Sequence, residues 1–231
     1  MVYFFPYLVM LCGGTCLYLG AEAVWTGFVF FFALIPVLEF IFKDVKFNSS
    51  QFKSKSATIS LYLTPVALTA ILFLALRGAY YTEDLFTLMG IILSTGPMLG
   101  AFGINSAHEL VHRREKKIRA LGVYNLILVN FAHWGLEHVF GHHKHVATPL
   151  DPATARKDEW LYLFWIRNYI GALKGAWHIS KERVASYWAL SLVISVVLYF
   201  SLGLKVLIIW WAISFVPFYY CKRLIISNIT L

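Results

Sequence analysis

The chain has 231 residues, of which 59% are hydrophobic and 14% are charged, and its formal net charge is +8. Soluble globular chains are about a quarter charged, so this composition indicates an integral membrane protein and excludes an ordinary soluble domain. The three Cys (Cys12, Cys16 and Cys221) are too scattered for a disulfide framework or a zinc ribbon.

Six apolar segments are long enough to cross a hydrocarbon core of about 30 Å. They lie near residues 3–19, 23–42, 57–76, 85–105, 186–204 and 206–220, and they predict an all-α polytopic membrane protein with a single membrane domain. The N-terminus lacks the basic leader of a cleaved signal peptide, so the first segment is expected to be retained. A short loop at residues 20–22 predicts that the first two spans form an antiparallel hairpin. Pro36, Pro65, Pro97 and Pro217 are expected inside spans, which they can kink, and neighbouring helices or local polar groups can satisfy the carbonyls they free.

Lys and Arg gather on one side of the predicted spans. Four Lys lie in residues 43–56, twelve Lys or Arg lie in the polar region 106–185, and two more follow the last span. Only Arg77 and Lys205 fall on the opposite side. The region 106–185 is expected to form a helical cap. The positive-inside rule predicts that this cap and both termini are cytoplasmic. The basic excess indicates orientation and attraction to anionic membrane lipid, and no nucleic-acid binding is expected.

Two stretches of this cap are expected at the membrane surface. Residues 121–135 are apolar but too short to span. Residues 160–177 mix Trp and Tyr with Lys and Arg, which is typical of an interfacial helix.

Six of the eight His fall in two short stretches of the cap. His108 and His112 are four residues apart, as are His138 and His142, and this spacing places each pair on one face of a helix. His143 adds a further ring, which is expected to point elsewhere. Imidazole is the commonest metal ligand, so the five rings predict a metal site, and by ligand type iron, copper or zinc would suit it.

Four neighbouring residues are candidates for supporting roles. Glu109, Glu137 and Asp151 can orient ligand imidazoles, or they can be exposed or capping carboxylates. His145 is expected on the solvent side or in support of the ligands. His133 is expected to be a packing or hydrogen-bonding residue rather than a ligand, and His178 is expected to lie at the membrane interface.

The first stretch also reads H-E-L-V-H, the pattern in which two His bind zinc and Glu109 acts as a general base. Asp151 would supply a third ligand, as in an intramembrane zinc metalloprotease. This alternative leaves His138, His142 and His143 unused, because one catalytic zinc needs three protein ligands.

Residues 137–156 read E-H-V-F-G-H-H-K-H-V-A-T-P-L-D-P-A-T-A-R. This run resembles the second histidine box of the membrane alkane 1-monooxygenases, E-H-x-x-G-H-H-x-x-V-A-T-P-x-D-P-A, within the desaturase-like histidine-box superfamily. Residues 108–112 resemble the first box. The resemblance covers the chain to about residue 218.

The resemblance implies a di-iron centre in the bacterial inner membrane, with His108, His112, His138, His142 and His143 as ligands. It implies terminal hydroxylation of n-alkanes to primary alcohols with O2, using electrons from rubredoxin. The family's later motifs, N-Y-x-E-H-Y-G and L-Q-R-H-x-D-H-H, do not occur in the 231 residues. The comparison with the family pattern therefore predicts a C-terminally truncated member that is inactive as written.

Two further alternatives stay open. A fatty-acyl desaturase or hydroxylase shares the histidine boxes, although the V-A-T-P-x-D-P-A run favours the alkane enzymes. A non-enzymatic remnant would fold but hold metal poorly.

Overall fold

The computed structural model describes residues 2–41 and 55–226, with side chains described from residue 3 onward in the first range and up to residue 216 in the second. Throughout these ranges the ordered elements are helices, and no strand is present among the described residues, so the predicted all-α class is confirmed. The N-terminal elements are η1 (Val2–Phe4), α1 (Phe5–Leu19), η2 (Ala21–Trp25), α2 (Thr26–Val29), η3 (Phe30–Leu34) and α3 (Ile35–Ile41). The central ones are α4 (Lys55–Tyr81), α5 (Leu85–Met98), η5 (Leu99–Ile104), α6 (Asn105–Val111), α7 (Lys116–Ile127) and α8 (Ala132–Glu137). The last are η6 (His138–His142), α9 (His143–His145), α10 (Leu161–Ile179) and α11 (Lys181–Ile226).

Four helical stretches are long and apolar enough to cross a membrane. They are Ala21–Ile41, Lys55–Tyr81, Leu85–Val111 and Lys181–Val216, and Phe5–Leu19 is a shorter apolar helix. The chain is therefore a membrane protein. The six-span count and the cytoplasmic side of the cap stay predictions. Residue 42 of the second predicted span, and three of the four Lys predicted to flank it (Lys43, Lys46 and Lys53), lie outside the described residues.

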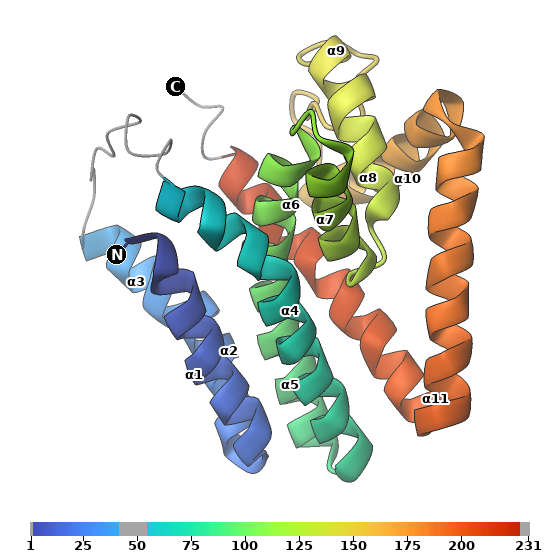
Figure 1. The fold of residues 1–231 in the computed structure, drawn as a ribbon. Coiled ribbons are helices and arrows are strands. Elements are labelled where there is room, and N and C mark those ends of the chain that lie inside the picture. Colours follow the sequence, from blue (N-terminus) through green and yellow to red (C-terminus); the bar gives the residue numbers. More distant parts are fainter. Residues whose placement is uncertain (1, 42–54, 227–231) are drawn as a thin grey trace.

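The last long helix, α11, is divided at Gly203, whose backbone angles are φ 86° and ψ 171°. The two arms form a hairpin at the end of the molecule opposite the histidines (Figure 1). A turn at Gly20, φ 74°, likewise separates α1 from η2 at that end, which confirms the predicted N-terminal hairpin. Lys205 fastens the second arm of α11 to the α4–α5 turn, because its ammonium donates to the Thr82 carbonyl at 2.8 Å and to Glu83 at 2.6 Å.

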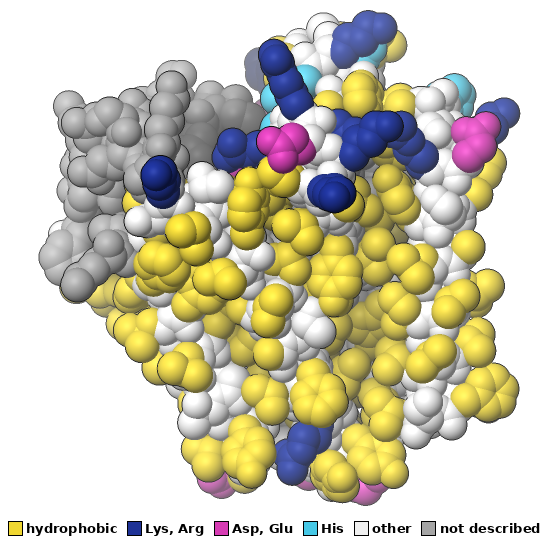
Figure 2. All heavy atoms as spheres, in the orientation of Figure 1, with side chains coloured by type: hydrophobic (Ala, Val, Ile, Leu, Met, Phe, Trp, Pro, Cys, Tyr) yellow, Lys and Arg dark blue, Asp and Glu magenta, His cyan; other side chains and the backbone are white. Residues whose placement is uncertain are grey.

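Hydrophobic side chains cover the middle of the molecule, whereas Lys, Arg and His gather at the cap end (Figure 2). Val66, Phe73 and Phe200 are among the most exposed, at 71%, 64% and 81%. Apolar exposure on this scale is unfavourable in water but suits contact with lipid. The belt therefore marks the membrane-facing part of the fold.

Buried polar side chains attach the cap to the spans. Pro65 has no N–H for the carbonyl of Leu61, and the Thr64 hydroxyl donates to that carbonyl at 2.8 Å, as expected for a proline inside a span. The buried Asn125 of α7 donates to Thr64 Oγ1 and to Ser106 Oγ, both at 3.0 Å. These bonds join α4, α6 and α7 directly beneath the histidines.

The stretch 121–135, which is predicted to lie in or under the membrane surface, is divided between two helices. α7 ends at Ile127, α8 begins at Ala132, and a turn with Asn130 at φ 53° lies between them. Side chains 125–133 are buried. By contrast, α10 forms where the interfacial helix was predicted, and it exposes Leu163, Ile166 and Ile170.

Candidate metal centre

The first histidine pair lies at the end of a continuous helical span. η5 widens the helix after α5, and α6 carries His108 and ends with His112 at its C-cap. The two ring centroids are 5.3 Å apart, so the four-residue spacing brings these rings together as predicted.

The second pair follows different geometry, because residues 138–142 form a π turn. In a π turn the backbone bonds run from residue i to i+5, so side chains about five positions apart align. His138 therefore meets His143, with the two Nε2 atoms 3.1 Å apart. The expectation that His143 points elsewhere was wrong, because it assumed α-helical periodicity.

His108, His112, His138 and His143 form one cluster, in which one ring nitrogen from each lies within 4.8 Å of the others. His112 Nε2 lies 3.2 Å from His138 Nε2. Imidazoles that share one ion at metal–nitrogen distances of about 2.0–2.1 Å place their nitrogens roughly 3 Å apart. The separations in the cluster therefore fit a shared metal ion held by imidazole ligands.

His138 and His112 are held in the neutral form that binds metal. Burial, and then the neighbouring imidazoles, lower the pKa of His138 to about 2. Burial, and then His143, also lower the pKa of His112. Trp134, one α-helical turn before His138, stacks on its ring at a centroid distance of 4.4 Å. Sequence reasoning missed Trp134, although its four-residue spacing from His138 was a usable signal.

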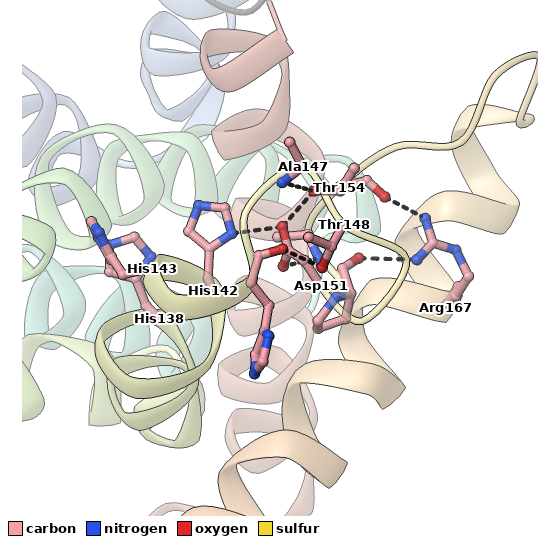
Figure 3. Close-up of polar contacts among 11 residues, drawn as sticks. His138, His142, His143, Ala147, Thr148, Asp151, Thr154 and Arg167 are labelled. Atoms are coloured by element: carbon pink, nitrogen blue, oxygen red, sulfur yellow. Dashed lines mark hydrogen bonds and ion pairs between the residues drawn. The ribbon is translucent and has the colours of Figure 1, made fainter.

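His142, the fifth predicted ligand, lies beside the four-histidine cluster. Its ring centroid is 5.4 Å from that of His138. Its Nδ1 lies 2.9 Å from Oδ2 of Asp151, whose side chain is fully buried (Figure 3). A hydrogen bond from Nδ1–H to the carboxylate leaves Nε2 as the nitrogen available for a metal.

The other predicted supporting residues take different positions. Glu109 is exposed and accepts from Arg113 at 2.7 Å, which counts against the zinc protease alternative because its general base should face the metal. Glu137 is buried where a Cβ on Gly141 would lie 2.7 Å from its Oε1. Desolvation, and then Asp151, raise the pKa of Glu137 to about 7.

A cleft of about 670 Å³ lies behind the second histidine stretch. His145 lines it together with Glu137, Lys144, Arg167 and Lys174. His133 lies in the interior, with its ring edge-on to Tyr169. His178 is exposed and bonds to the Lys174 carbonyl on its own helix.

Comparisons with known proteins found a matching family and several relatives. Residues 84–229 match the fatty acid desaturase family. The chain is 29% identical over 199 residues to alkane 1-monooxygenase 1 of Alcanivorax borkumensis, covering 78% of this chain and 49% of that protein. It is 30% identical over 221 residues to alkane 1-monooxygenase of Pseudomonas putida, covering 83% and 53%.

A third relative is the xylene/toluene monooxygenase hydroxylase component of Pseudomonas putida, which is 27% identical over 197 residues and is covered over 53% of its length. The chain thus spans about half the length of these curated relatives.

Proposed function

Because the chain belongs to the fatty acid desaturase family, we propose that it forms the metal-binding core of a membrane alkane 1-monooxygenase. The observation that carries the proposal is the cluster of His108, His112, His138 and His143, which gathers four imidazoles at one end of the apolar belt. The alkane 1-monooxygenase relatives support the same reaction class.

The proposed ligands are these four residues together with His142. Histidine-rich sites suit iron, copper or zinc, and the resemblance of the histidine boxes favours two irons. Bound iron would supply the redox chemistry that inserts one atom of O2 into a terminal C–H bond of an n-alkane and releases the other as water, with two electrons delivered by rubredoxin and two protons from solvent.

The side chains of this chain would hold and shield that chemistry. The Asp151 carboxylate fixes the orientation of the His142 ring, and Trp134 packs flat on His138. An alkane has no polar group to recognise, so its selection falls to apolar walls. The aromatic-rich spans would supply such walls.

Orientation follows from charge. Lys and Arg are concentrated at the histidine end, which supports a cytoplasmic position for that end in the bacterial inner membrane. Rubredoxin would then reach the cluster from the cytoplasm.

The first test concerns metal. We expect the purified chain, loaded anaerobically with Fe²⁺, to retain iron, and the variant His138→Ala to lose most of it, because His138 bonds to two other members of the cluster. Metal analysis measures both. Equal iron in the two proteins would contradict the proposed site, and zinc retained in preference to iron would favour the protease alternative.

The second test concerns the reaction. A chimera in which the Pseudomonas putida relative carries residues 84–216 of this chain should convert octane to 1-octanol when supplied with rubredoxin and its reductase. The same chimera with His138→Ala is the matched control. An iron-loaded chimera that leaves octane unchanged but introduces a double bond into a fatty-acyl substrate would favour the desaturase alternative.

A further inference from the structure

The side chain of Arg167 on α10 forms hydrogen bonds with the loop that precedes this helix (Figure 3). Its guanidinium donates to the Pro152 carbonyl at 3.2 Å and to the Thr154 carbonyl at 2.9 Å. It also pairs with both carboxylate oxygens of Glu159, at 2.5 and 2.6 Å. Arginine alone presents its donors in a planar fork of this kind, so lysine cannot make all of these bonds at once.

The same loop also packs closely against α10, where Pro152 lies next to Gly171. A Cβ added to Gly171, one turn after Arg167, would lie 2.4 Å from Cβ of Pro152. The absence of a side chain at Gly171 therefore sets how closely the loop approaches the helix. Arg167 holds the loop by hydrogen bonds, and Gly171 permits the distance at which those bonds form.

Inside the loop, further hydrogen bonds connect Thr154, whose carbonyl accepts from Arg167, to Asp151. The Thr154 hydroxyl donates to Asp151 Oδ2 at 2.5 Å and accepts from the Ala147 N–H at 3.0 Å. The Ala153 N–H donates to Asp151 Oδ1 at 2.9 Å. A fully buried carboxylate with both oxygens bonded has little freedom to move. The backbone position of residues 147–154 therefore fixes this carboxylate.

Asp151 in turn holds the ring of His142. We propose that Arg167 is a positioning residue, which fixes the loop so that Asp151 presents Nε2 of His142 to a metal ion. The inference rests on the proposed role of His142 as a ligand. If Arg167 has this role, the position of α10 relative to the loop influences the affinity of the site for a metal ion.

Two variants perturb this arrangement by different means. Arg167→Lys keeps the positive charge but loses the fork, and Gly171→Ala keeps every hydrogen-bonding group but pushes Pro152 away. Lys174→Gln is the matched control, because Lys174 lines the same cleft from the same helix. His142→Ala shows what loss of the ligand itself does. Circular dichroism confirms that each variant retains its helicity.

The probe is Co²⁺, titrated into the purified full chain and followed by its visible absorption, with hydrogen exchange of residues 146–160 measured on the metal-free protein. We expect Arg167→Lys and Gly171→Ala to speed exchange at Ala147 and Ala153 and to weaken Co²⁺ binding at least about tenfold, as loss of a supporting partner of a ligand does. Lys174→Gln should change neither quantity.

Faster exchange in the loop with wild-type Co²⁺ affinity would overturn the proposal, and so would unchanged exchange in both variants. If His142→Ala binds Co²⁺ as the wild type does, His142 is not a ligand, and the ligand assignment fails. A wild-type chain that binds no Co²⁺ would refute the metal site itself, whatever the loop does.

Discussion

His133 is a neutral imidazole buried in the protein interior, away from the metal cluster. Burial lowers its pKa from about 6.5 to about 4. The folded state therefore binds fewer protons here than the unfolded state between those values, and its stability falls as the pH drops from 6.5 to 4. From the shift, the loss is roughly 3 kcal/mol, and above pH 6.5 this residue contributes no pH dependence.

Replacement of His133 by Phe should remove this acid-sensitive contribution, because an apolar ring suits neighbours such as Phe131 and Tyr169. Denaturant unfolding in detergent at pH 7 and pH 4 measures the effect, and the difference between the two pH values should be smaller in the variant. An equal pH dependence in both proteins would show that other groups control acid stability.

Among the helical elements, Gly203 gives a direct test of the hairpin in α11. Its φ of 86° and ψ of 171° lie in a region that residues with a Cβ rarely enter, although nothing lies within 4 Å of the position that a Cβ would take. We expect Gly203→Ala to destabilise the protein by about 1–3 kcal/mol through backbone strain alone. Unfolding in mixed micelles measures the loss, and Ser201→Ala on the same turn should be nearly neutral.

The elements also show where sequence periodicity succeeds and fails. Long apolar runs predicted the span helices, because one helix needs only length and hydropathy to be recognised. The π turn at residues 138–142 was not predictable, since nothing in E-H-V-F-G-H-H specifies an i→i+5 bond. The role of Arg167 was hidden for another reason: its contacts are to carbonyls of a loop, whose conformation depends on the whole fold.

Over the whole molecule, charge asymmetry predicts orientation. Lys and Arg crowd the histidine end (Figure 2), whereas at the other end Lys205 is paired with Glu83. In a variant with all three Cys replaced by Ala, we expect a membrane-impermeant maleimide to label Ser201→Cys in cells with a permeabilised outer membrane. Lys157→Cys should be labelled only after lysis. The reverse pattern would place the histidines outside the cytoplasm.

At the same scale, the histidine boxes predicted which imidazoles lie close together, and their role as metal ligands stays a prediction. All five predicted ligands lie in one region, four of them in the cluster. Hydropathy placed residues 121–135 in or under the membrane surface, but it did not predict that Asn125 is buried and donates hydrogen bonds to α4 and α6.

The π turn has a consequence for how the second histidine stretch tolerates changes in chain length. Removal of one residue from 139–141 would place the present His143 four positions after His138, the α-helical spacing. Because the turn would tighten at the same time, a histidine would still face His138. We therefore expect the wide turn to preserve the contact between His138 and His143 through a one-residue deletion, whereas His142 would shift relative to His138.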